Sequence, residues 1–84
     1  ALLNELFAPQ EVFLRLQELG PVADEEAYKT WNMGQCVLFV TPDPEKVERV
    51  LEEFEIPTKL VGKITKGDGV TCRSKGREKR EFVI

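Results

Sequence analysis

Few residues in this sequence could carry out catalysis. It contains no histidine, so the commonest general base of enzymes is absent. Ser74, Cys36 and Cys72 have no general base nearby in the sequence, which leaves a nucleophilic mechanism without support. The two cysteines lack the spacing and the extra nitrogen or sulfur ligands of a zinc site. We expect both to be reduced, half-buried strand residues that bind no metal.

Two other patterns have a structural interpretation. Glu25 and Glu26 are adjacent, so on a helix they point in different directions, and both lie where the helix dipole favours acidic groups. The run Lys66-Gly67-Asp68-Gly69 has the glycines of a phosphate-binding loop but lacks its spacing, and no helix follows it. We therefore interpret the acidic pair as structural and the glycine run as a hairpin turn.

The segment from Tyr28 to Gly34 is the most unusual part of the chain. An aromatic residue, an amide and a glycine (Trp31, Asn32 and Gly34) meet where a helix gives way to a strand. Asn tolerates left-handed backbone, and Gly allows another chain segment to approach closely. The residue types alone indicate a tight junction.

The first half of the chain predicts two helices. One runs from about Pro9 to Leu19 and ends at Gly20, which we expect in the left-handed conformation. A shorter helix from Asp24 to Trp31 has Asp24 as its N-cap. The expected apolar face of the first helix consists of Val12, Phe13, Leu16 and Leu19.

The second half predicts four strands and one helix. Gln35 to Val40 is apolar enough to be a strand covered on both faces. Asp43 is the expected cap of a helix that starts at Pro44 and ends before Pro57. Its apolar stripe consists of Val47, Val50, Leu51 and Phe54. The remaining strands are Thr58 to Thr65, Val70 to Ser74 and Arg80 to Ile84.

This order, α-α-β-α-β-β-β, predicts one α+β domain over residues 1–84, with a mainly antiparallel or mixed sheet and the helices packed on it. The net charge is −3, and Glu78 and Glu81 interrupt the basic residues Lys75 to Arg80, so we expect no nucleic-acid partner. No apolar run could cross a membrane, and the N-terminus does not resemble a signal peptide, so we expect a cytoplasmic protein.

The unusual segment also carries a family resemblance. Residues 26–34, Glu-Ala-Tyr-Lys-Thr-Trp-Asn-Met-Gly, resemble the Glu-Met-Tyr-Arg-Thr-Phe-Asn-Met-Gly segment of aminoimidazole ribonucleotide synthetases, also called phosphoribosylformylglycinamidine cyclo-ligases. Residues 9–20 resemble the Pro-x-x-Phe helix of that family and its Leu-Gln-x-x-Gly end. Residues 60–64 are similar to its Ile-Gly-x-Ile strand. The resemblance covers roughly Ala8 to Thr65.

The resemblance implies a role in purine biosynthesis. The family closes formylglycinamidine ribonucleotide to aminoimidazole ribonucleotide with ATP and magnesium. This chain resembles the second half of its C-terminal domain and lacks the ATP-binding segments, so we expect the chain alone to be inactive and without a cofactor. The resemblance places Asn32, Met33 and Gly34, with Lys29 and Thr30, on the substrate side of the cleft. Lys29 stands where the family usually has Arg.

Two alternatives remain. Synthetases that make selenophosphate or a thiamine phosphate share the architecture, and Cys36 stands where the cyclo-ligases often have a second glycine. The chain could instead be a standalone, non-catalytic interaction module. Half of a domain should leave an unpaired sheet edge and some exposed apolar surface, so we expect a dimer or a higher oligomer.

Overall fold

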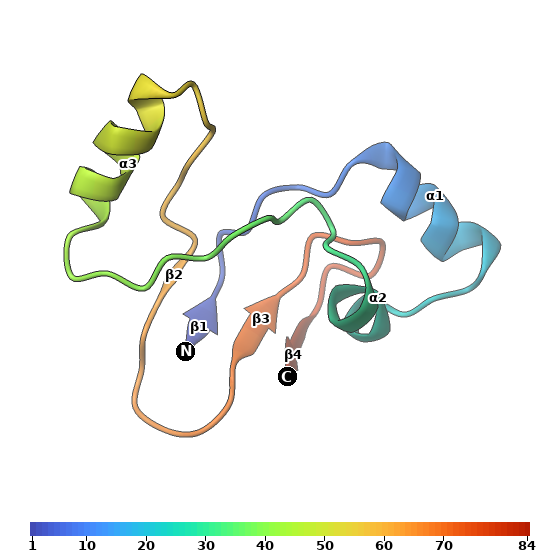
Figure 1. The fold of residues 1–84 in the computed structure, drawn as a ribbon. Helices are drawn as coiled ribbons and strands as arrows, with labels where there is room; N and C mark the ends of the chain where they lie inside the picture. Colours follow the sequence, from blue (N-terminus) through green and yellow to red (C-terminus); the bar gives the residue numbers. More distant parts are fainter.

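A small mixed sheet joins the two ends of the chain in the computed structural model, which describes residues 1–84 (Figure 1). Its strands are β1 (Leu2–Leu3), β2 (Gly62–Lys63), β3 (Thr71–Arg73) and β4 (Glu81–Val83), in the spatial order β2-β1-β3-β4. The pair β1–β3 is parallel, and the pairs β1–β2 and β3–β4 are antiparallel. With three helices this gives the order β-α-α-α-β-β-β, so the α+β class is confirmed.

Strand β1 was not predicted from the sequence, because two leucines are too short a run to show alternation. It lies between β2 and β3, so the turn of residues 66–69 does not join neighbouring strands, and its interpretation as a hairpin turn is wrong. The last two strands do form a hairpin, in which Cys72 pairs with Phe82. All three predicted C-terminal strands are present, but each is shorter than expected.

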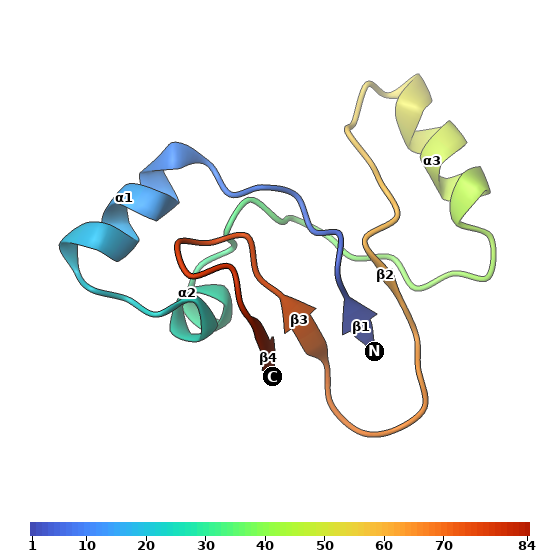
Figure 2. The same ribbon diagram turned by 180° about the vertical axis from the view of Figure 1, so that it is seen from behind.

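Helix α3 (Pro44–Glu53) begins where the sequence predicted. The Asp43 Oδ1 accepts a hydrogen bond from the Lys46 N–H at 3.2 Å, and Pro44 occupies the first helical position. In both views, however, α3 stands away from the sheet (Figures 1 and 2). No residue of α3 is buried, so its apolar stripe has no core to cover in this chain.

Helices α1 (Glu11–Leu19) and α2 (Asp24–Thr30) differ in detail from expectation. The first starts two residues later than Pro9, and Gly20 has a φ of −99°, so the predicted left-handed stop is wrong. The N-cap of α2 is Ala23 rather than Asp24, and Ala23 has no side chain with which to cap. Asp24 lies in the first turn instead, because its carboxylate bonds to a distant hairpin.

The predicted apolar face of α1 is on the surface. Val12, Leu16 and Leu19 are exposed, and the one buried residue of α1 is Gln17. Of that face, Phe13 has an aromatic neighbour, with its ring centroid 6.3 Å from that of Trp31. A polar side chain takes the inward position because it bonds to Asp24 on α2.

The predicted strand over Gln35 to Val40 is also wrong for this chain. Its residues belong to no strand, and the side chains Val37–Val40 are 53–79% exposed. The sheet does not extend to this segment, so no neighbouring strand is present to pair with it.

The core is small and lies where α2 meets the β3–β4 hairpin. Tyr28 packs on Phe82 with 5.8 Å between the ring centroids. The buried apolar residues are Leu6, Ala27, Met33, Cys72 and Phe82. The molecule is flat, with extents of 40 × 33 × 16 Å. Helix α2 is therefore the helix that the core fixes most firmly.

Candidate functional site

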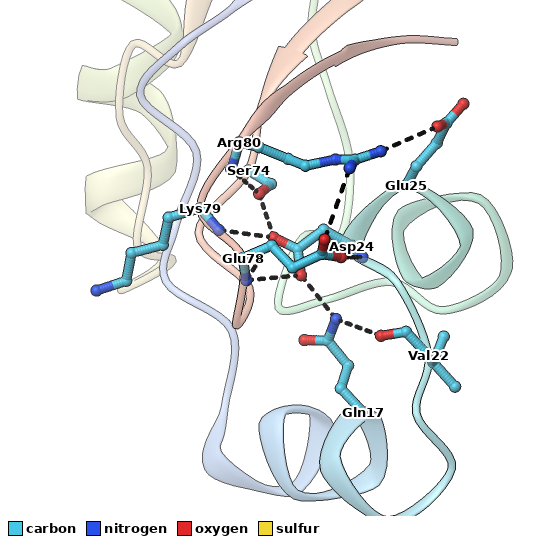
Figure 3. A network of polar contacts seen from close by, with 8 residues as sticks. All are labelled: Gln17, Val22, Asp24, Glu25, Ser74, Glu78, Lys79 and Arg80. Carbon is cyan, nitrogen blue, oxygen red and sulfur yellow. Dashed lines mark hydrogen bonds and ion pairs between the residues drawn. The ribbon is translucent and has the colours of Figure 1, made fainter.

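The N-terminus of α2 is tied to the β3–β4 hairpin through one buried carboxylate (Figure 3). Asp24 is fully buried and accepts hydrogen bonds from four donors. Gln17 Nε2 donates at 2.8 Å and the Lys79 N–H at 2.9 Å. The Glu78 N–H donates at 3.2 Å to both carboxylate oxygens, and the Ser74 hydroxyl donates to Oδ2. Three chain segments therefore meet at a single side chain.

The hairpin approaches Asp24 closely because residue 76 is glycine. A Cβ at Gly76 would lie 2.5 Å from Asp24 Oδ1 and 2.9 Å from Gln17 Oε1. Burial by itself would raise the pKa of the Asp24 carboxyl, but the bonds from Ser74, Gln17, Glu78 and Lys79 outweigh it. The pKa of Asp24 is consequently lowered, and the group is a carboxylate at neutral pH.

Further contacts hold α2 against the same hairpin. Glu78 Oε1 accepts a hydrogen bond from the Asp24 N–H at 2.7 Å, and the Tyr28 hydroxyl accepts one from the Lys75 N–H at 3.0 Å. Arg80 lies 3.7 Å from Glu25 and 3.6 Å from Glu78. Glu25, the first residue of the acidic pair Glu25-Glu26, therefore has a structural role. These contacts fix the direction in which α2 delivers the segment that follows it.

That segment is a tight junction. Asn32 Oδ1 accepts a hydrogen bond from the Gly34 N–H at 2.9 Å, and the Gln35 N–H donates to the Asn32 carbonyl at 2.9 Å. Met33 and Gly34 have positive φ values of 48° and 86°. A Cβ at Gly34 would lie 3.0 Å from the Ala8 carbonyl oxygen. Glycine is therefore needed here for both its backbone conformation and its small size.

Gln35 fastens the junction to the N-terminal segment. Its Nε2 donates to the Phe7 carbonyl at 2.7 Å and to the Met33 carbonyl at 2.9 Å. Its Oε1 accepts from the Phe7 N–H at 3.1 Å. The junction is therefore held at both ends, by the buried carboxylate before it and by Gln35 after it.

The five candidate residues lie together in the last turn of α2 and the junction, but they differ in access. Met33 is fully buried, so its side chain packs in the core. Lys29 is exposed and pairs with Glu25 at 3.2 Å, and Thr30 is exposed at the end of α2. Asn32 is exposed, and its Nδ2 makes no hydrogen bond while its Oδ1 holds the turn.

The sequence did not reveal the Asp24 network. Gln17, Asp24 and Ser74 are 7 and 50 positions apart and form no motif. Asp24 itself was singled out, but as a cap, since acidic residues at helix starts normally have that role. Gly76 in Lys75-Gly76-Arg77 indicated a turn, but it could not indicate that the Asp24 carboxylate lies against that turn.

The arrangement can offer an amide, a hydroxyl and an ammonium group to a polar ligand. No three His, Cys, Asp or Glu side chains lie close enough to hold a metal ion. The N-terminus of α3 carries Asp43 and Glu45, which would repel a phosphate. The residues present thus do not fit a magnesium–ATP complex. Two shallow surface grooves, one beside Gln17 and Arg77 and one beside α3, include none of the five candidates.

Comparison with known proteins gives a consistent result. The chain is 39% identical over 84 residues to the phosphoribosylformylglycinamidine cyclo-ligase of Methanococcus maripaludis strain C5, a match that covers 98% of this chain and 23% of the relative. It is 36% identical over 78 residues to that of Methanopyrus kandleri, covering 90% of this chain and 22% of the relative. The Thermoplasma acidophilum enzyme is 32% identical over 69 residues, 81% of this chain and 20% of the relative.

The chain thus spans about a quarter of the length of these relatives. No protein-family model and no solved structure matches it. None of the helices is long and apolar enough to cross a membrane.

Proposed function

We propose that this chain, which is homologous to a region of the phosphoribosylformylglycinamidine cyclo-ligases, acts as the second half of the C-terminal domain of such a purine-biosynthetic enzyme. In this role it supplies the substrate side of the cleft and is inactive by itself. The observation that carries the proposal is the exposed Asn32, whose free amide N–H groups lie on a junction braced at both ends.

Asn32 has separate uses for its two side-chain atoms. Its Oδ1 accepts from the Gly34 N–H, which fixes the side chain, while Nδ2 keeps two donors for a partner. A fixed donor loses little conformational freedom when it binds, so it suits recognition of a carbonyl or phosphate oxygen on the substrate. Lys29, one turn earlier, can leave its exposed ion pair with Glu25 at little cost and add a positive charge.

ATP and magnesium belong to other parts of such an enzyme under this proposal. When bound, ATP would activate the formyl oxygen of the substrate so that an amidine nitrogen can close the ring. The residues of this chain would only hold and orient the substrate, since they include neither a phosphate-binding loop nor a cluster of carboxylates for magnesium.

The proposal can be tested in a chimaera in which these 84 residues replace the matching region of the M. maripaludis enzyme. We expect cyclo-ligase activity. Asn32→Asp keeps the oxygen that bonds to Gly34, so the melting curve should not change. It loses the amide donors and adds a charge, so kcat/KM should fall about tenfold or more.

Glu26→Gln is the matched control, because Glu26 is exposed on the same helix and makes no ion pair or side-chain hydrogen bond. It should leave kcat/KM unchanged and destabilise the fold by only about 0.3–1 kcal/mol, the cost of losing a negative charge in the first turn of α2. A folded chimaera without cyclo-ligase activity would refute the assignment. A fully active Asn32→Asp chimaera would reduce the junction to a structural role.

A second candidate function is a non-catalytic interaction module. It is favoured by the exposed apolar segment Val37–Val40 and by the bare stripe of α3. The chimaera can instead be tested with the substrates of the synthetases that make selenophosphate or a thiamine phosphate. Activity with those substrates alone would assign the chain to one of those synthetases and not to the cyclo-ligases. If it is absent with all of them, the module interpretation gains support.

A further inference from the structure

The β3–β4 hairpin encloses the Asp24 carboxylate as a receptor encloses an anion (Figure 3). The N–H groups of Glu78 and Lys79 donate to it at 3.2 and 2.9 Å, and Lys79 has a positive φ of 49°. Successive N–H groups that converge in this way form a nest, a concavity that binds anions. The Ser74 hydroxyl donates to the same carboxylate and accepts from the Arg80 N–H at 3.0 Å. These two N–H groups and the hydroxyl are here called the hairpin nest.

The hairpin nest fits one carboxylate closely. A Cβ at Gly76 would lie 2.5 Å from Asp24 Oδ1, and Gln17 Nε2 donates to the same oxygen at 2.8 Å. Asp24→Ala would remove the carboxylate and leave all these donors facing a space of the size of a formate ion. Formate can therefore replace the missing group without a further change of the chain.

Helix α2 transmits the position of Asp24 to its other end. The Asp24 N–H also bonds to the hairpin, at 2.7 Å from Glu78 Oε1. Halfway along the helix, Tyr28 packs on Phe82 and accepts a hydrogen bond from the Lys75 N–H. When the carboxylate is lost, α2 can tilt about this middle contact. Its two ends, about 9 Å apart, then move in opposite directions.

The junction after α2 converts such a tilt into a displaced amide. The Trp31 N–H bonds to the Ala27 carbonyl at 2.7 Å, so the junction starts directly from the last turn of the helix. Asn32 comes next, with its Oδ1 held by the Gly34 N–H. Gln35 is fastened to the N-terminal segment, so the far end of the junction does not follow the helix. A tilt of α2 therefore has to be taken up at Asn32 and its neighbours.

We propose that Asp24 is a positioning residue: held in the hairpin nest, it sets where α2 places the Asn32 amide. Asp24 acts through the helix, because it is fully buried and both of its carboxylate oxygens already accept hydrogen bonds. Its importance for catalysis rests on the proposed function, in which Asn32 Nδ2 binds the substrate. Misplacement of such a group by about 1 Å can cost about 100-fold in rate.

Amide NMR spectra of the chain, with and without formate, test the position of the junction independently of any activity. Asp24→Ala should shift the signals of the Gly34 N–H and of the Asn32 side-chain amide. Formate should return both toward their native positions in a saturable way, and an equal concentration of potassium chloride should not. Glu45→Ala is the matched control, because Glu45 is also an acidic residue in the first turn of a helix but lies on α3. Junction signals that keep their native positions in Asp24→Ala would overturn the inference.

A double-mutant cycle in the chimaera tests whether Asp24 acts through Asn32. Well below the melting temperature, Asp24→Ala should lower kcat/KM about tenfold or more, and formate should restore most of the loss. In an Asn32→Asp background the same change should cost less than about threefold, because both residues act through one amide. Losses that simply multiply would overturn the inference, as would formate that restores the melting temperature but not kcat/KM.

A second variant covers the case in which Asp24→Ala does not fold even with formate. Ser74→Ala removes one donor of the hairpin nest and keeps the carboxylate, so it should shift the same junction signals by a smaller amount. A folded Ser74→Ala chain with native junction signals would then overturn the inference. Failure of the proposed function is a separate result: it is an inactive native chimaera, and the spectra still decide whether Asp24 positions the junction.

Discussion

Replacing Asp24 by asparagine should destabilise this chain far more than any other isosteric change of an acidic residue. The change keeps the shape and one oxygen but puts an NH2 group where the second oxygen accepts hydrogen bonds. At least one buried donor among Ser74, Lys79 and Glu78 then loses its acceptor. A buried donor without a partner costs about 1–3 kcal/mol. Loss of a negative charge in the first turn of α2 adds about 0.3–1 kcal/mol.

We therefore expect Asp24→Asn to lose about 2–3 kcal/mol. A chain of this size has a total free energy of unfolding of about 4–12 kcal/mol, so the loss is a large fraction of it. At about 4–8 °C per kcal/mol for a domain of this length, the melting temperature should fall by about 10–20 °C. The assay is thermal unfolding followed by circular dichroism at one fixed protein concentration, near pH 7, with Glu26→Gln as the control.

The dependence on pH separates the carboxylate from other effects of the change. The pKa of Asp24 is lower in the folded than in the unfolded chain, so its contribution is complete above the unfolded value of about 3.9. It is lost as the pH falls through the folded value. The gap between native and Asp24→Asn melting temperatures should thus narrow below about pH 4. A melting temperature unchanged at neutral pH, or a gap that persists in acid, would refute the reasoning.

Two further predictions concern the hairpin and the nucleotide. Gly76→Ala should destabilise the chain by about 1–3 kcal/mol, because the new methyl group would lie 2.5 Å from Asp24 Oδ1; Gly20→Ala, where the nearest atoms lie at 3.4 Å, should be nearly neutral in the same melting experiment. The isolated chain should neither hydrolyse ATP nor bind magnesium–ATP, since its residues form no phosphate-binding loop or carboxylate cluster. Saturable binding in calorimetry would contradict that assignment of parts.

The features predicted correctly from the sequence are those that local chemistry determines. Asp43 and Pro44 fix the start of α3 whatever surrounds it, and the β3–β4 hairpin needs only a turn and two alternating strands. The resemblance that indicated the family is likewise carried by the local segment 26–34, and the comparisons confirm the family. At the candidate site, the turn at Asn32 and the close approach at Gly34 follow from the residue types.

The features predicted wrongly depend on what lies elsewhere in the chain. The apolar run Gln35 to Val40 has strand composition, but a strand exists only when a neighbour supplies its hydrogen bonds. The apolar face of α1 gives way to Gln17, because a buried carboxylate on α2 requires a donor. Strand β1 forms by pairing with β2 and β3, and the sequence around Leu2 contains no pattern that predicts these partners.

The position of β1 has a consequence for how the chain folds. Strand β1 lies inside the sheet, and its Leu2 pairs with Lys63 and Thr71, about 60 and 70 residues later. Closing a loop of about 70 residues has an entropic cost of nearly 4 kcal/mol from its length dependence alone. The sheet therefore cannot form from neighbouring segments alone. Strand β1 pairs only after residues 62–73 have come close to it, so this pairing should form more slowly than the local β3–β4 hairpin.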